Sequence, residues 1–184
     1  MKRLLFLTCI FAYCALLPAQ EHLMFMGIPL TGTINQFQTK LQAKGVRHDR
    51  QLSNELPRGT RAFKGTFSNR KANISVYYNS KTLLVYAAKA YIPDLTEENA
   101  NELFELFKHN LLTKYADGIA NDEDEDSFII YVPNKAYDRA IGYISLYIWK
   151  DESYYNYPYL YSVHIQYNDW INSEKNDNVT LEDY

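Results

Sequence analysis

The feature that most constrains the fold is a long amphipathic segment, residues 94–118. Apolar residues in it recur at steps of three and four, which places them on one face of a helix. They are Ala100, Leu103, Phe104, Phe107, Leu111 and Tyr115. Burying this face contributes on the order of 10 kcal/mol before the loss of chain entropy is subtracted. The helix therefore needs a second layer to cover it, and strand-like segments lie on both sides.

The ends of this helix carry recognisable signals. Asp94 can cap the first turn, with Glu97 three residues later closing a capping box. Lys108, His109 and Lys114 lie towards the C-terminal end, where the helix dipole favours cations. We expect Gly118 to supply a left-handed stop.

A second, shorter helix is predicted near the start of the chain. Thr33 is followed three residues later by Gln36, the spacing of a capping box. Ile34, Phe37 and Leu41 then form a narrow apolar stripe, and Gly45 marks the end of the helix.

The rest of the chain predicts strands separated by short turns. The expected strands are residues 46–52, 61–67, 73–78, 82–92, 128–132, 140–149 and 157–167, after an extended lead-in at 22–30. Residues 82–92 are nearly all apolar and are expected at the centre of the sheet. Residues 53–60, 121–127 and 151–156 read as a polar turn, an acidic loop and a further turn, and residues 79–81 are short enough for a hairpin.

These elements predict an α+β fold, with two helices packed on one face of a curved antiparallel sheet of about seven strands. Each half starts with a capped helix that ends in Gly and continues into strands, the order that a diverged duplication would give. We expect one domain over residues 20–171. Residues 172–184 are polar, acidic and without pattern, and are expected to be a flexible tail.

The first nineteen residues have the pattern of a signal peptide. Lys2 and Arg3 precede an apolar run over residues 4–17, and Ala19 offers a small residue for cleavage before Gln20. The alternative is a buried N-terminal helix. We expect cleavage, a periplasmic or secreted protein, and no membrane insertion afterwards. Both cysteines, Cys9 and Cys14, would be removed, which leaves no disulfide and no thiolate site.

The charge of the mature chain limits its partners. The whole sequence has 19 basic and 22 acidic residues, and loss of Lys2 and Arg3 changes the net charge from −3 to −5. This balance argues against nucleic acid and against anionic membrane surfaces. The sequence leaves the oligomeric state open.

The run HLMFMGIPLTGT at residues 22–33, followed by Phe37, Lys40, Leu41, Lys44 and Gly45, resembles the opening of a set of small exported proteins from anaerobic gut bacteria. The resemblance continues through residues 65–67, 111–115 and 165–169, although Ala116 and Asp117 intervene before Gly118. It implies export and assigns no activity. The predicted order of elements, in which a helix followed by antiparallel strands occurs twice, also resembles in outline the β-lactamase inhibitor protein and small outer-membrane assembly lipoproteins.

No motif predicts a metal, a cofactor or a catalytic centre. The acidic run at residues 122–126 lacks the spacing of a calcium-binding EF-hand loop, whose sixth and twelfth positions fall on Ser127 and Pro133. His22 and His48 lack the spacing of a zinc site, and His109 is better placed for an ion pair with Glu105. We therefore expect no cofactor and no metal.

Tyrosine is the most unusual feature, because ten of the 17 tyrosines lie between Tyr131 and Tyr167. Along residues 140–149 the aliphatic side chains share one parity, which suits a core that faces the helices. The opposite parity carries Tyr143, Tyr147 and Trp149, and the following strand adds His164 and Gln166. These five residues are the candidate ligand-binding site, on the outer surface of the sheet. The alternative is that tyrosine and tryptophan are present for their strand propensity.

We therefore expect an exported, non-catalytic binding protein that holds a protein or a glycan on an aromatic sheet face or on the loop at residues 151–159. One alternative is an exported enzyme, such as a hydrolase, with a site assembled from distant residues. Another is a structural or assembly module of the cell envelope.

Overall fold

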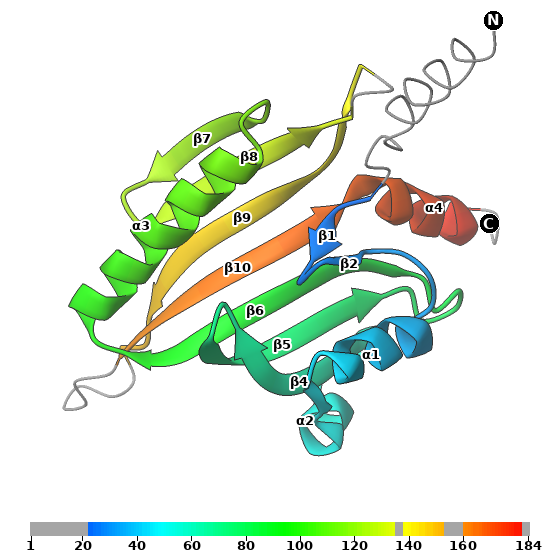
Figure 1. The fold of residues 1–184 in the computed structure, drawn as a ribbon. Helices are drawn as coiled ribbons and strands as arrows, with labels where there is room; N and C mark the ends of the chain where they lie inside the picture. Colours follow the sequence, from blue (N-terminus) through cyan, green and yellow to red (C-terminus); the bar gives the residue numbers. More distant parts are fainter. Residues whose placement is uncertain (1–21, 135–137, 153–159, 182–184) are drawn as a thin grey trace, which may run out of the picture.

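The structure is a computed structural model that describes residues 22–134, 138–152 and 160–181 (Figure 1). Its helices are α1 (Ile34–Ala43), α2 (Arg50–Glu55), α3 (Glu97–Lys114) and α4 (Trp170–Leu181). Its strands are β1 (Met24–Phe25), β2 (Ile28–Pro29), β3 (Arg47–His48), β4 (Thr60–Phe67), β5 (Arg70–Tyr78), β6 (Val85–Leu95), β7 (Ile119–Asp124), β8 (Ser127–Pro133), β9 (Ala140–Lys150) and β10 (Tyr161–Asp169). The α+β class is confirmed.

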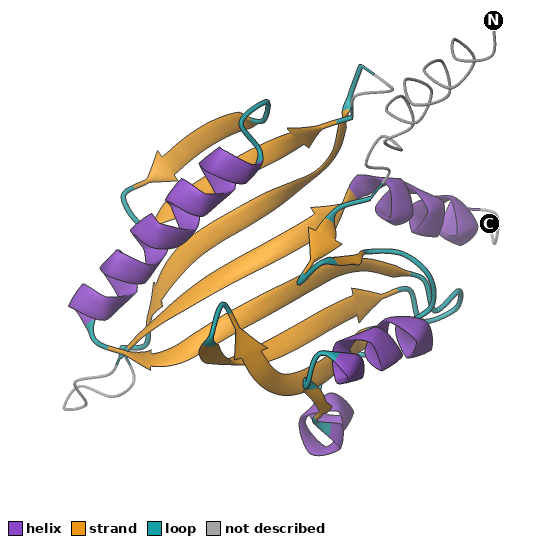
Figure 2. Cartoon of the chain, viewed as in Figure 1, coloured by secondary structure: helices purple, strands orange, loops and turns teal. Residues whose placement is uncertain are grey.

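The main sheet has eight antiparallel strands in the order β3-β4-β5-β6-β10-β9-β8-β7, and β1 and β2 form a separate hairpin. The two predicted helices, α1 and α3, lie on the same face of this sheet (Figure 2). Their apolar side chains join those of the strands in one core. The predicted arrangement of helices on one sheet face is therefore correct, with one strand more than expected.

The sheet is built from two halves of the same plan. In each half a helix is followed by four strands that pair in chain order, and α2 is an addition to the first half. The halves meet where β6 pairs antiparallel with β10 in the middle of the sheet. An origin by duplication stays a prediction, and this topology is what it would produce.

Helix α3 buries the face that the sequence predicts, since Phe104 and Phe107 are each 3% exposed. Its start differs from the prediction: Thr96 is the N-cap, and its hydroxyl accepts a hydrogen bond from the Asn99 amide. Asp94 belongs to the end of β6 and has a φ of 60°. The expected stop is also wrong, because Gly118 is outside the set of described glycines with positive φ. Glycine suits this position for another reason: a Cβ atom on residue 118 would lie only 2.9 Å from the carbonyl oxygen of Tyr131.

Helix α1 follows its prediction closely. The capping box between Thr33 and Gln36 is present in both directions, and Phe37 and Leu41 are fully buried. The helix ends at Lys44, and Gly45 takes the left-handed conformation with a φ of 82°. A side chain there would strain the backbone, which is why glycine suits the position.

Two segments have a different structure from the one expected. The weak strand over 46–52 is reduced to β3, because Asp49 caps α2 by accepting a hydrogen bond from the Leu52 amide at 3.1 Å. The acidic loop over 121–127 is largely strand β7. Pairing with β8 forms this strand at the edge of the sheet, where the carboxylates of Asp122 and Asp124 are exposed to water.

The expected flexible tail is also corrected, because residues 170–181 form α4. Asn172 is fully buried, and its amide group donates hydrogen bonds to the carbonyls of Leu30 and Val85 at 2.5 and 2.9 Å. These bonds help to hold α4 on the sheet, together with Trp170 and Ile171, whose apolar side chains also pack against it. Residues 182–184 lie outside the described part of the chain.

The N-terminal hairpin is held by the end of the main sheet. Asp169 of β10 is 1% exposed and accepts hydrogen bonds from the backbone amides of Leu23 and Asn172, at 2.9 and 3.0 Å. His22 Nδ1 lies 3.1 Å from the same carboxylate. The expected signal peptide and both cysteines precede the described residues. Within those residues, no helix has the length and apolar character needed to cross a membrane.

Candidate ligand-binding face

The outer face of the sheet, defined as the face opposite α1 and α3, carries the aromatic parity of β9. Ile144 and Leu146 point inward and are fully buried. The alternate residues Tyr143, Tyr147 and Trp149 lie on the outer face. The two tyrosines are partly buried, and Trp149 is 59% exposed. The alternation that the sequence predicted along this strand is therefore present.

The register of β9 with β10 brings the candidate residues together. Tyr147 lies opposite His164, and Trp149 lies opposite Ser162. Gln166 lies two positions along from His164, on the same face and opposite Ser145. All of the predicted site residues thus lie on one face of two neighbouring strands.

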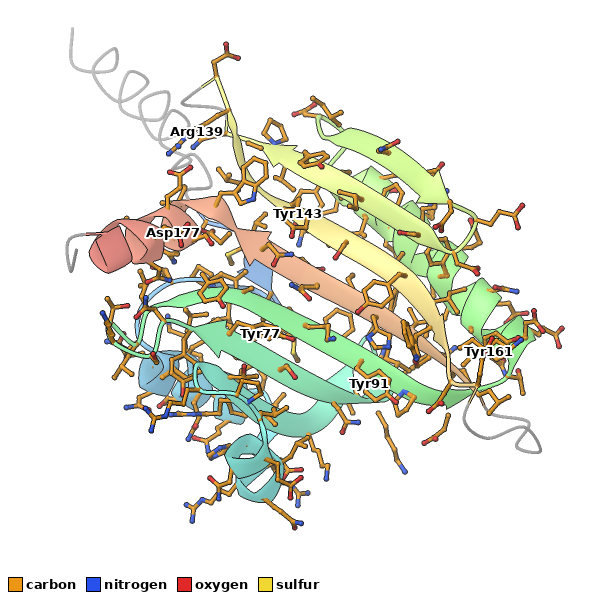
Figure 3. All side chains as sticks on the ribbon, turned by 180° about the vertical axis from the view of Figure 1, so that it is seen from behind. Tyr77, Tyr91, Arg139, Tyr143, Tyr161 and Asp177 are labelled. Carbon is orange, nitrogen blue, oxygen red and sulfur yellow. The ribbon has the colours of Figure 1, made fainter. Side chains whose placement is uncertain are left out.

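His164 lies between two aromatic rings. Tyr147 stacks on it with ring centroids 4.6 Å apart, and Tyr91 of β6 contacts it from the other side at 4.8 Å. We call Tyr91, Tyr147, Trp149 and His164 the aromatic patch. Figure 3 shows Tyr91 on this face of the sheet. Sequence reasoning missed Tyr91, because only the pairing of β6 with β10 reveals that it is the neighbour of His164.

The environment of His164 keeps its imidazole neutral at pH 7. Burial, followed by the positive charge of Lys89, lowers the pKa of His164 to about 4. Its Nε2 atom lies 3.0 Å from the Ser162 hydroxyl, and its Nδ1 atom is buried without a hydrogen-bond partner. Burial also raises the pKa of Tyr147, so this phenol stays protonated and can donate a hydrogen bond.

The Ser162–His164 pair does not form a hydrolytic centre. Ser162 is only 5% exposed, so a substrate carbonyl cannot reach its hydroxyl. A general base also works best with a pKa near the operating pH, which the low pKa of His164 does not provide. In the described part of the chain, no carboxylate hydrogen-bonds to the imidazole to orient it.

Tyr143 is separate from the aromatic patch. Its ring packs against Trp170, at the start of α4, and Tyr131 of β8, with centroids 6.0 and 6.1 Å away. It lies six residues along β9 from Trp149, roughly 20 Å at the usual rise of a strand. Tyr143 therefore packs against α4, while Tyr147 and His164 lie one position along the outer face from Trp149.

The described residues contain no group of three or more His, Cys, Asp or Glu side chains that could hold a metal ion. In the acidic run, Asp122 forms an ion pair with Lys108 at 2.6 Å, and Asp124 accepts a hydrogen bond from the Asp126 amide. The ion pair joins β7 to α3, and the hydrogen bond lies in the turn between β7 and β8.

Comparison of this chain with protein families, with curated proteins and with solved structures found no match. The proposals below therefore depend on the geometry of this structure.

Proposed function

We propose that this chain is an exported, non-catalytic binding protein that holds a glycan or a protein on its aromatic patch. The observation that supports this most directly is the exposure of Trp149, at 59%, beside the row formed by Tyr147, His164 and Tyr91. A large indole left in water on an ordered strand offers apolar area that a ligand can cover.

The patch is also stiff. Its rings belong to three adjacent strands of the central sheet, and the stacking of His164 against Tyr147 holds two of them. Rigid aromatic side chains lose little conformational entropy when a ligand binds, which is why they dominate the binding energy of many interfaces.

Polar groups beside the rings would give the ligand orientation. Gln166 and Lys89 lie directly opposite each other on β10 and β6, one position along the outer face from His164 and Tyr91. Flat rings flanked by an amide and an ammonium group suit a sugar, which presents an apolar ring face and hydroxyls at its edge. They also suit a protein loop with a polar rim.

The test is a glycan-array screen and a pull-down with the mature protein, each done with the wild type and with Trp149→Ala. We expect the variant to bind its ligand at least tenfold more weakly while keeping its fold. Ile119→Ala is the matched control, because Ile119 is the most exposed large apolar side chain among the described residues, at 74%, and lies on the distant edge strand β7.

Equal binding by the wild type and Trp149→Ala would place the ligand elsewhere. The next candidate would be the segment 151–159, of which residues 153–159 lie outside the described part of the chain. Equal loss in Trp149→Ala and Ile119→Ala would indicate non-specific hydrophobic adhesion.

A further inference from the structure

The charges of this chain are segregated along its length. Residues 22–93 contain 11 basic and two acidic residues, whereas residues 94–184 contain six basic and 19 acidic residues. The first set includes β3, β4, β5 and most of β6, so it forms one side of the sheet, and α3 and β7 belong to the other (Figure 1). Although the net charge of the whole chain is small, the side of the sheet formed by residues 22–93 is therefore strongly basic.

A groove of about 720 Å³ lies at the basic edge of the sheet. Its cationic lining comes from four elements: Lys44 after α1, Arg47 of β3, Arg50 of α2 and Lys64 of β4. Gly45 leaves part of the wall without a side chain, and the space beside it is open.

Asp49 is the one carboxylate among the described residues that line this groove, and it already has hydrogen-bond and ion-pair partners. It accepts a hydrogen bond from the Leu52 amide and pairs with Lys64 at 2.7 Å. The bond from Lys64, followed by that from Leu52, lowers the pKa of Asp49. In the described part of the chain, Lys44, Arg47 and Arg50 have no ion pair and no side-chain hydrogen bond.

His48 adds no further charge to the groove at neutral pH. Its ring packs on Phe63 and its Nε2 atom lies 3.1 Å from the Ser53 hydroxyl. Burial, followed by the nearby guanidinium groups of Arg61 and Arg50, lowers the pKa of His48. The cationic character therefore comes from the three unpaired side chains and from the basic residues around them.

We propose that this groove binds an anionic polysaccharide, one whose sugar units carry sulfate or carboxylate groups. The three unpaired cations come from the end of α1, from β3 and from α2, so they match charges repeated along an extended ligand better than one small anion. Each exposed ion pair contributes little by itself, and an extended polyanion gains affinity from several of them together.

Two other ligands fit the groove less well. Among the described residues, no Phe, Tyr or Trp lines it, so single-stranded nucleic acid would lack the rings on which its bases stack. A protein that adds a strand to the sheet would find only two residues in β3, between α1 and α2. That is too short an edge for strand addition.

This site is independent of the proposed function. The groove lies at strand β3 and Trp149 on β9, five strand spacings apart, or about 24 Å at the usual spacing within a sheet. The two surfaces can therefore be tested by different substitutions.

The experiment measures binding of heparin and of polygalacturonate to the mature protein by calorimetry, with dextran as the neutral control. We expect the protein to bind at least one of the two polyanions and not dextran. Affinity should fall by about tenfold or more between 50 and 200 mM salt, because exposed ion pairs are screened. The double variant Arg47→Glu, Arg50→Glu should bind at least tenfold more weakly. Trp149→Ala should bind these polyanions as the wild type does.

The matched control is Arg58→Glu, Arg70→Glu. Both residues are exposed in the same basic half, outside the lining of the groove, and the change in net charge is identical. Equal weakening by both double variants would overturn the proposal, because it would show attraction by overall charge alone. Tighter binding of a single-stranded oligonucleotide than of either polysaccharide would also overturn it.

A third contrary result concerns a second copy of this chain. The wild type could self-associate at low salt and bind neither polysaccharide. If the double variant Arg47→Glu, Arg50→Glu abolished that self-association, the acidic half of another copy would be the occupant of the groove, and the proposal would be wrong. Circular dichroism of each variant checks that the fold is retained.

Discussion

The imidazole ring of His164 lies nearly parallel to the phenol ring of Tyr147, with centroids 4.6 Å apart and an interplanar angle of 19°. The contact joins β10 to β9 on the outer face, and Tyr91 continues it to β6. A ring held between two others and shielded from water resists protonation, and this makes the patch sensitive to acid.

We predict that His164 makes the folded protein less stable in mild acid. Its pKa is about 4 in the folded protein and near 6.5 when unfolded, so between these values the unfolded chain binds more protons. The free energy of unfolding therefore falls as the pH drops from 6.5 towards 4, by about 1–2 kcal/mol after allowance for solvent screening. Urea denaturation of the wild type and His164→Gln at pH 7 and 4.5 measures this. The loss should be smaller in His164→Gln, and an equal loss in both would contradict the prediction.

Phe107 is expected to be the most sensitive position on α3. It is 3% exposed and meets Phe67 edge-on at 5.8 Å, so Phe107→Ala should lower the free energy of unfolding by roughly 3–5 kcal/mol. His109 lies on the exposed side of the same helix, and His109→Ala should stay within about 0.5 kcal/mol. Similar denaturation midpoints for the two variants would show that the helix faces the other way.

Asn172 tests the docking of α4. Asn172→Ala removes two donors and leaves the carbonyls of Leu30 and Val85 buried without these partners. We expect a loss of about 2–3 kcal/mol in chemical denaturation. The exposed Lys175 is the control on the same helix, since Lys175→Ala should change stability by less than about 0.5 kcal/mol. A neutral Asn172→Ala variant would restore the expectation of a loosely held tail.

Export is predicted from the signal-peptide pattern of residues 1–19. The intact mass of the protein recovered from the periplasm or medium should correspond to a chain that starts at Gln20, or within two residues of it. Retention of Met1 in that fraction would contradict the localisation.

Local signals in the sequence were sufficient for the helices that pack on the sheet. The capping box at Thr33 and the apolar stripe through Phe107 are patterns of neighbouring residues, and both are present in the structure. The predicted start of α3 is wrong because Asp94 and Thr96 are both residue types that cap helices well. The pairing of β6 with β10 extends the strand to Leu95, so the helix can begin only after it.

Features that depend on long-range pairing could not be predicted in the same way. The acidic run of β7 looked like a loop because charges are rare in strands, and only its place at the sheet edge explains it. Helix α4 was missed because its contacts come from the amide of Asn172 and from the adjacent Trp170 and Ile171, which give no apolar periodicity along the helix. The contact of Tyr91 with His164 likewise required the strand order.

The central position of β10 has a consequence for how the chain is made. Until residues 161–169 have been synthesised, β6 and β9 each lack a neighbour, and the two halves of the sheet cannot join. Asp169, which holds Leu23 by its amide, also becomes available only then, 146 residues after its partner. A chain with this connectivity cannot complete its main sheet before its last strand has been made. That order of assembly would suit the predicted export, in which the chain would cross a membrane unfolded.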